Sequence, residues 1–214
     1  MKKALVVWGG LEMHEPEAGA HVVRTLLEPE GFDVTVTGDY TALGGGDIAG
    51  FDLIVPQITG GELSREHSIR FEEAVRAGSG LAGFHYGLAT TFHGNMRMRF
   101  MAGCTFASHP GNIINYRVDP VPNGDPIMAG IESFEHTSEQ YYIHLDPAVT
   151  DILATTTFSG EHAPWRAGTV VPQVYKTTYG SARVFYTPLG HCPAELEKPE
   201  IRTILKRGLL WAAR

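Results

Sequence analysis

The stretch GFHYG at residues 83–87 places a histidine where α/β enzymes often carry a nucleophile. In those enzymes a strand ends in a sharp turn, and small residues flank a Ser that projects above the sheet. Here Gly83 and Gly87 flank His85. An imidazole at this position can act as a general base or bind a metal ion, and it cannot supply a thiolate.

Other histidines lie beside predicted turns. His14 follows the first predicted strand, His191 follows the last, and His109 lies in the loop SHPGN. With Glu139, these residues allow two chemistries. Imidazole and carboxylate groups bind zinc or a similar divalent ion, for which His14, His85 and His191 are the candidate ligands. The same groups could do acid–base work without a metal, with His85, His191 and Glu139 as the catalytic residues. There is no HExxH motif to decide between them.

Several aromatic residues also have two interpretations. Tyr86, Tyr141, Tyr142 and Trp165 could stack on sugar rings or could pack in the core. The candidate substrate-binding set consists of His14, His109, Tyr86, Tyr142 and Trp165. The two cysteines, at positions 104 and 192, do not form a CxxC pair, which argues against a zinc ribbon or a redox motif.

The first half of the chain alternates strand and helix. We expect two helices here. One begins at Pro16, and the other has Ser64 as its N-cap and runs to about Ala77. Short β-rich runs predict strands at 4–8, 33–37, 52–55 and 80–84. This alternation predicts a parallel sheet with helices on both faces. The functional crevice of such a sheet lies outside the carboxyl ends of its strands, so His14, His85 and His191 should share one site.

The second half is less regular. Strands are predicted at 115–118, 152–157, 170–176 and 182–189, the last two joined by a tight turn at Gly180-Ser181. A terminal helix begins near Pro199. No linker or repeat interrupts the chain, and its 214 residues fit one domain spanning 1–214.

Composition narrows the classes of partner. The net charge of -7 argues against nucleic acid, because phosphate binding needs a basic face. The apolar run in MKKALVVWGG is too short for a signal peptide, and no run reaches the ~18 residues of a membrane span. We therefore expect a cytoplasmic protein with a small-molecule ligand and no membrane partner. The sequence leaves open whether the protein forms a homo-oligomer, since no sequence feature shows one.

Five motifs together resemble one family. They are GGxxxH, with Gly9, Gly10 and His14; GFH on the elbow; SHP; EQYY; and GSARVFYTPLGH followed by RTILKRGLLWA. This combination, spread over essentially the whole chain, resembles the ThuA-like, or trehalose-utilisation, family. The resemblance implies a three-layer α/β/α, flavodoxin-like fold related to class I glutamine amidotransferases, with a mostly parallel central sheet.

The resemblance also implies a role in carbohydrate use, on trehalose or on keto-disaccharides made by a partner sugar dehydrogenase. It places His85 where the amidotransferases carry their catalytic cysteine, so amidotransferase activity is not expected. No GxGxxG follows the first strand, which argues against NAD. Two hypotheses remain: a sugar-active isomerase, lyase or hydrolase, or a non-catalytic sugar-binding or regulatory domain.

Overall fold

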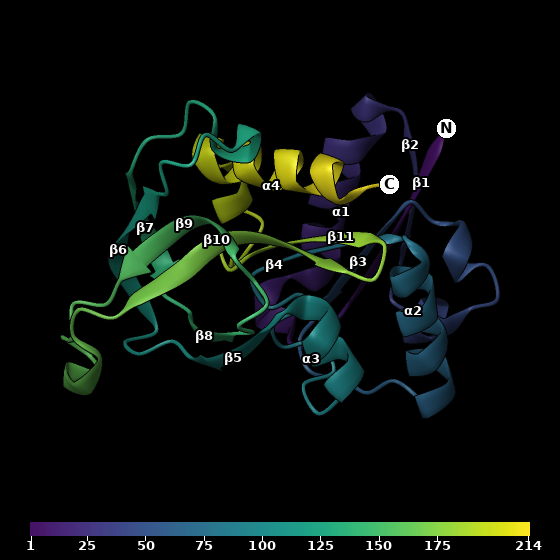
Figure 1. Ribbon diagram of the computed structural model, residues 1–214, viewed down its shortest axis with the longest axis horizontal. Helices are drawn as coiled ribbons and strands as arrows, with labels where there is room; N and C mark the ends of the chain where they lie inside the picture. Colours follow the sequence, from purple (N-terminus) through teal and green to yellow (C-terminus); the bar gives the residue numbers. More distant parts are fainter.

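The computed structural model describes residues 1–214 and contains a nine-stranded mixed sheet with the strand order β2-β1-β3-β4-β11-β10-β9-β6-β7, beside a two-stranded sheet of β5 and β8 (Figure 1). The strands are β1 (Lys2–Gly9), β2 (Phe32–Thr37), β3 (Leu53–Ile58), β4 (Gly80–Phe84), β5 (Cys104–Ser108), β6 (Ile113–Pro120), β7 (Phe134–Glu139), β8 (Tyr142–Leu145), β9 (Asp151–Thr157), β10 (Val170–Tyr179) and β11 (Ala182–Thr187). The α-helices are α1 (Pro16–Leu27), α2 (Arg65–Ala77), α3 (Met96–Ala102) and α4 (Pro199–Ala212).

The parallel half of the sheet follows the sequence pattern. Strands β2, β1, β3, β4 and β11 pair in parallel, in the order found in flavodoxin-like sheets. Every residue of β3 and β4 is buried, because helices cover both faces. This half brings the carboxyl ends of β1, β3, β4 and β11 to one edge.

The expectation of a mostly parallel sheet was wrong, because the sheet is mixed. Strands β10, β9, β6 and β7 extend it by antiparallel pairing. A tight turn, in which Gly180 has a φ of 59°, reverses the chain between β10 and β11. Such a hairpin imposes antiparallel pairing, whereas a parallel partner needs a crossover of a dozen or more residues.

Four elements of the second half were not predicted: α3, β5, β7 and β8. In β7 the buried positions include His136 and Ser138, beside an apolar residue at Phe134. Polar residues turned inward break the alternation of apolar and polar side chains that predicts a half-buried strand. The hydrophobic pattern therefore could not reveal β7.

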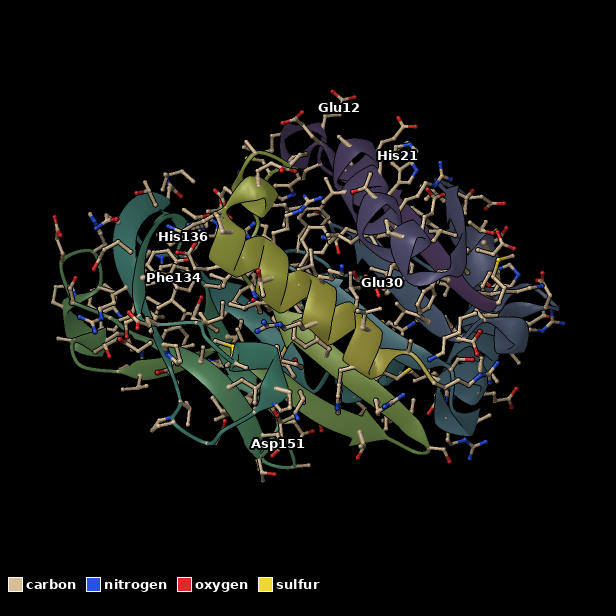
Figure 2. All side chains as sticks on the ribbon, turned by 90° about the horizontal axis from the view of Figure 1, so that it is seen from above. Glu12, His21, Glu30, Phe134, His136 and Asp151 are labelled. Atoms are coloured by element: carbon tan, nitrogen blue, oxygen red, sulfur yellow. The ribbon has the colours of Figure 1, made fainter.

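Helices cover both faces of the large sheet. Side chains of α1 and α4 pack in one core, and those of α2 and α3 pack in the other. Figure 2 shows α4 lying across the sheet, with α1 on the same side and the labelled Phe134 and His136 beside the start of α4. No α-helix is long and apolar enough to cross a membrane.

Candidate functional site

His85 lies on a strained turn directly after β4. Its φ of 45° is in the left-handed region, which costs an L-residue roughly 1–2 kcal/mol. The flanking glycines allow the turn. A Cβ on Gly83 would lie 2.6 Å from Leu88 Cγ, and a Cβ on Gly87 would lie 2.2 Å from Gln57 Oε1. The elbow predicted from GFHYG is therefore present, with an imidazole at its tip.

Hydrogen bonds fix both the backbone and the ring of His85. Its N–H donates to the Thr187 carbonyl at 2.7 Å, and the Tyr186 hydroxyl donates to its carbonyl at 2.6 Å. Nδ1 lies 2.9 Å from the Pro188 carbonyl oxygen. Because that oxygen can only accept, Nδ1 carries a proton, and Nε2 of the neutral ring presents a lone pair.

That lone pair faces two other potential ligand atoms. His85 Nε2 lies 3.0 Å from His191 Nδ1 and 3.2 Å from Glu139 Oε2, and the last two atoms are 3.3 Å apart. With His14, one nitrogen or oxygen from each residue lies within 4.8 Å of the others. We call these four residues the histidine–glutamate cluster.

The parts of the cluster come from four separate segments. His14 lies in the turn after β1, where its Nδ1 is 2.9 Å from Thr59 Oγ1 and its ring stacks on Tyr86 with 4.5 Å between centroids. Glu139 is the last residue of β7, and His191 follows β11. The sequence prediction that His14, His85 and His191 meet at the strand ends therefore agrees with the structure.

Burial and neighbouring charges shift the pKa values of the cluster residues in different directions. His85 is completely buried, and burial lowers its pKa despite the neighbouring Glu139. The hydrogen bond to Glu139 raises the pKa of His191. Burial opposes ionisation of Glu139, but the hydrogen bond from His191 holds the pKa of Glu139 well below the usual range. His14 has its pKa lowered to about 4 by burial and by the nearby His85. A proton on the cluster therefore resides between His191 and Glu139.

Tyr141 belongs to the site, although the sequence analysis placed only Tyr142 of this pair in the substrate-binding set. Its hydroxyl lies 3.1 Å from His85 Nε2, and its side chain is only 2% exposed. Burial and the charge of Glu139 raise its pKa well above the ordinary value, so the hydroxyl stays protonated and donates to Nε2. The EQYY motif is the only signal that could have found it.

Glu195 is a second residue that the sequence did not reveal. Its Oε2 accepts hydrogen bonds from the His191 backbone N–H and from Ser138 Oγ, both at 2.9 Å. The same oxygen lies 3.2 Å from His136 Nε2. These contacts lower the pKa of Glu195 against its burial and hold the loop that carries His191.

The other predicted substrate contacts lie outside the cluster. His109 borders it, with Nε2 3.7 Å from Glu139 Oε1 and a side chain 30% exposed. Tyr86 is buried behind His14. Tyr142 packs against Phe158, and Trp165 is 77% exposed on the loop between β9 and β10, which projects at the lower left of Figure 1.

Neither cysteine occupies the elbow. Cys104 is buried on β5, where burial raises the pKa of its thiol to about 11. Cys192 is half-buried and directly follows His191. A thiol with a raised pKa holds little thiolate at neutral pH and is a poor nucleophile.

Comparison with known families decides the relationship of the chain. The family model ThuA, described as trehalose utilisation, matches residues 3–212. The chain belongs to the ThuA family. No curated protein matches the chain significantly.

Solved structures show the same fold at low sequence identity. A ThuA-like protein of Parabacteroides merdae ATCC 43184 aligns with a TM-score of 0.81 and 22% identity over 99% of this ThuA-family chain and 89% of its own. A cytoplasmic protein of Salmonella typhimurium LT2 aligns at 0.69 and 11% over the whole of both chains. A β-galactosidase of Rahnella sp. R3 aligns at 0.63 and 18% over this whole chain and 32% of its own.

Proposed function

We propose that this ThuA-family protein is a carbohydrate-active enzyme, and that the histidine–glutamate cluster holds a divalent metal ion that polarises the carbonyl group of a keto-sugar. The observation that carries the proposal is the convergence of His85 Nε2, His191 Nδ1 and Glu139 Oε2 at 3.0–3.3 Å from one another. Zn–N bonds of about 2.0–2.1 Å place neighbouring tetrahedral ligands roughly 3.3 Å apart.

The surroundings of the cluster support metal binding. The Pro188 carbonyl holds His85 in the tautomer that directs the Nε2 lone pair inward, which is how metal-binding histidines are commonly oriented. Thr59 engages Nδ1 of His14 and leaves its other nitrogen free. Glu139 is ionised, so it would partly neutralise a bound cation. Metal binding would displace the proton shared by His191 and Glu139.

The chemistry follows from these groups. His14, His85, His191 and Glu139 would hold the metal ion, which would supply a Lewis acid able to polarise a keto-sugar carbonyl and so acidify the neighbouring carbon. His109 is the most exposed of the site histidines and borders Glu139 Oε1, and it would take the proton from that carbon and return it. With a metal ion on His85 Nε2, the Tyr141 hydroxyl would be free to donate its hydrogen bond to the substrate oxygen. Isomerisation and elimination both begin with this step.

The same geometry argues against glutamine hydrolysis. That reaction needs a thiolate on the elbow, and this elbow carries His85. The keto-sugar would come from an oxidation, such as that of a partner sugar dehydrogenase, and both reactions would take place in the cytoplasm.

The test is the metal content of purified protein after incubation with zinc, manganese or cobalt. We expect about one equivalent in the wild type and a loss in Glu139→Gln and His191→Gln. His21→Ala is the control, because His21 is exposed on α1 (Figure 2) and is not one of the cluster residues. Thermal melting of each variant shows that it is folded. Equal metal content in wild type and Glu139→Gln would reject the site.

Turnover separates this proposal from the alternative of a sugar-binding or regulatory domain. Keto-sugar consumption that requires the bound metal and falls in His109→Ala supports an enzyme. Sugar binding with no turnover, in protein that contains the metal, would favour the non-catalytic domain.

A further inference from the structure

The guanidinium of Arg99, on α3, donates only to backbone carbonyl oxygens. Nη1 donates to Ala89 at 2.5 Å and to Cys104 at 3.4 Å, and Nη2 donates to Leu88 at 2.8 Å and to Thr91. The residue is half-buried, and burial lowers its pKa. Carbonyl dipoles, rather than a carboxylate, therefore stabilise this charge. Three of the four acceptors lie in the loop that follows the elbow.

That loop, residues 85–95 between β4 and α3, is strained at three positions. His85, Leu88 and Phe92 have φ values of 45°, 59° and 46°. Side chains other than glycine rarely adopt this left-handed region, and such residues persist where the surrounding contacts hold the backbone. Arg99 binds the carbonyl of the strained Leu88 and the carbonyl just before the strained Phe92. Its guanidinium is thus one of the contacts that hold the loop in this conformation.

A second side chain holds the same loop from the side of the sheet. Thr91 is completely buried. Its Oγ1 accepts from the Leu88 N–H at 3.1 Å and donates to the carbonyl of Ile58, the last residue of β3, at 2.8 Å. The loop is therefore fixed to α3 by Arg99 and to β3 by Thr91.

The residues held in this way contact the elbow itself. A Cβ on Gly83 would lie 2.6 Å from Leu88 Cγ, so Leu88 packs directly on the backbone before His85. The N–H and Oγ1 of Thr90 donate to the carbonyl of Tyr86, the residue after His85, at 3.1 and 2.8 Å. A movement of the loop would therefore move the backbone on both sides of His85.

A small movement of His85 matters because the ligand atoms of the cluster are close together. His85 Nε2 lies 3.0 Å from His191 Nδ1 and 3.2 Å from Glu139 Oε2. Side chains that bind a metal ion together have to be held within about 0.5 Å of the geometry that the ion requires. The contacts that fix the loop therefore bear on metal affinity as well as on stability.

We infer that Arg99, with Thr91 on the opposite side of the loop, is a positioning residue that fixes His85 Nε2 opposite His191 and Glu139. The effect on metal affinity rests on the proposed function, whereas the effect on the ring of His85 does not. Arginine suits this role because its planar guanidinium reaches separate acceptors with two nitrogens, and lysine would offer one.

The test compares Arg99→Lys with Arg97→Lys in the full chain. Arg97 is the matched control, because it lies on the same helix and pairs with Glu72 instead of the loop. Titration of metal-free protein with Zn²⁺ should show affinity about 10- to 100-fold weaker in Arg99→Lys, as the loss of partners behind metal ligands commonly does, and unchanged in Arg97→Lys. The chemical shifts of the His85 ring nitrogens, measured by NMR without metal, should change in Arg99→Lys and not in Arg97→Lys.

A second pair of variants tests the same role if Arg99→Lys does not fold. Thr91→Val removes the hydroxyl and keeps the branched shape of the side chain, and Thr91→Ser keeps the hydroxyl. We expect Thr91→Val to weaken Zn²⁺ binding and to shift the His85 ring nitrogens, and Thr91→Ser to resemble the wild type in both measurements.

A purely stabilising role predicts a different result. Folded Arg99→Lys and Thr91→Val proteins with lower melting temperatures, but with the Zn²⁺ affinity and His85 shifts of the wild type, would overturn the inference. If the wild type binds no metal and the His85 shifts still change in Arg99→Lys, the metal centre alone is contradicted. If the wild type binds metal and neither measurement changes in the variants, the positioning role alone is contradicted.

Discussion

His85 Nε2 lies 3.0 Å from His191 Nδ1, although the two residues are 106 positions apart in the chain. The contact arises because β4 and β11 are parallel neighbours and each histidine follows the carboxyl end of its strand. Two ring nitrogens at this distance cannot both carry a proton. His85 Nε2 is the unprotonated one, because His85 carries its proton on Nδ1.

The hydroxyl of Tyr141 competes with a metal ion for the lone pair of His85 Nε2. Replacing Tyr141 with Phe removes this competing hydrogen bond, which is worth about 0.5–1.5 kcal/mol, and keeps the ring. We expect metal affinity to rise roughly 2- to 10-fold, measured by competition with a chelator. A weaker affinity in Tyr141→Phe would show that the hydroxyl supports the bound metal instead.

Glu195 is expected to position His191 without touching the metal. Glu195→Gln replaces the charged acceptor of the His191 N–H with a neutral one. Loss of such an outer partner commonly costs about 10- to 100-fold in metal affinity. Calorimetric titration of the metal-free variant with Zn²⁺ measures this metal affinity. Glu197→Gln, at an exposed carboxylate paired with Arg202, should bind metal like the wild type. A normal affinity in Glu195→Gln would contradict the positioning role.

The stability of the metal-free protein should fall in acid because of His14. The pKa of His14 in the folded state, about 4, lies below its ordinary value of 6.5, so between these values the unfolded chain binds the proton first. His14 therefore stabilises the fold above pH 6.5, and this contribution is lost as the pH falls toward 4. His85, with a lowered pKa, acts in the same direction. The raised pKa of His191 stabilises the fold below pH 6.5 and loses that effect as the pH rises.

Urea unfolding at pH 7, 6, 5 and 4.5 checks this dependence on acid. We expect the free energy of unfolding to decrease from pH 6.5 to 4.5 in the wild type and to decrease less steeply in His14→Gln, which cannot titrate there. If the free energy of unfolding falls equally steeply in both proteins, His14 binds its proton as readily in the folded protein as in the unfolded chain.

The elbow should not tolerate a side chain at Gly87. An added Cβ would lie 2.2 Å from Gln57 Oε1, and the Gln57 amide donates to the Phe84 carbonyl at 2.7 Å. We expect Gly87→Ala to destabilise the protein by about 1–3 kcal/mol, as overpacking does. A lower melting temperature of Gly87→Ala than of the wild type would show this loss of stability. Gly94→Ala is the control, because its Cβ would meet nothing within 4 Å.

The sequence alone determined the parallel half of the fold and half of the site. Alternating strand and helix patterns in the first 85 residues require parallel strands, and parallel strands bring their carboxyl ends to one edge. His14 and His85 could therefore be placed together from their positions after strands. The glycines around His85 showed the elbow, since only small residues fit so sharp a turn.

Only the tertiary structure decided the other half. Glu139, Tyr141 and Glu195 reach the site through antiparallel strands and loops whose pairing depends on contacts between distant segments. Strand β7 turns polar residues inward, where partners such as Glu195 satisfy them, so its local pattern does not show which face is buried. A periodic sequence records which side of an element meets the core. It does not record which distant side chain completes a hydrogen bond there, and the distances within the cluster follow from that packing.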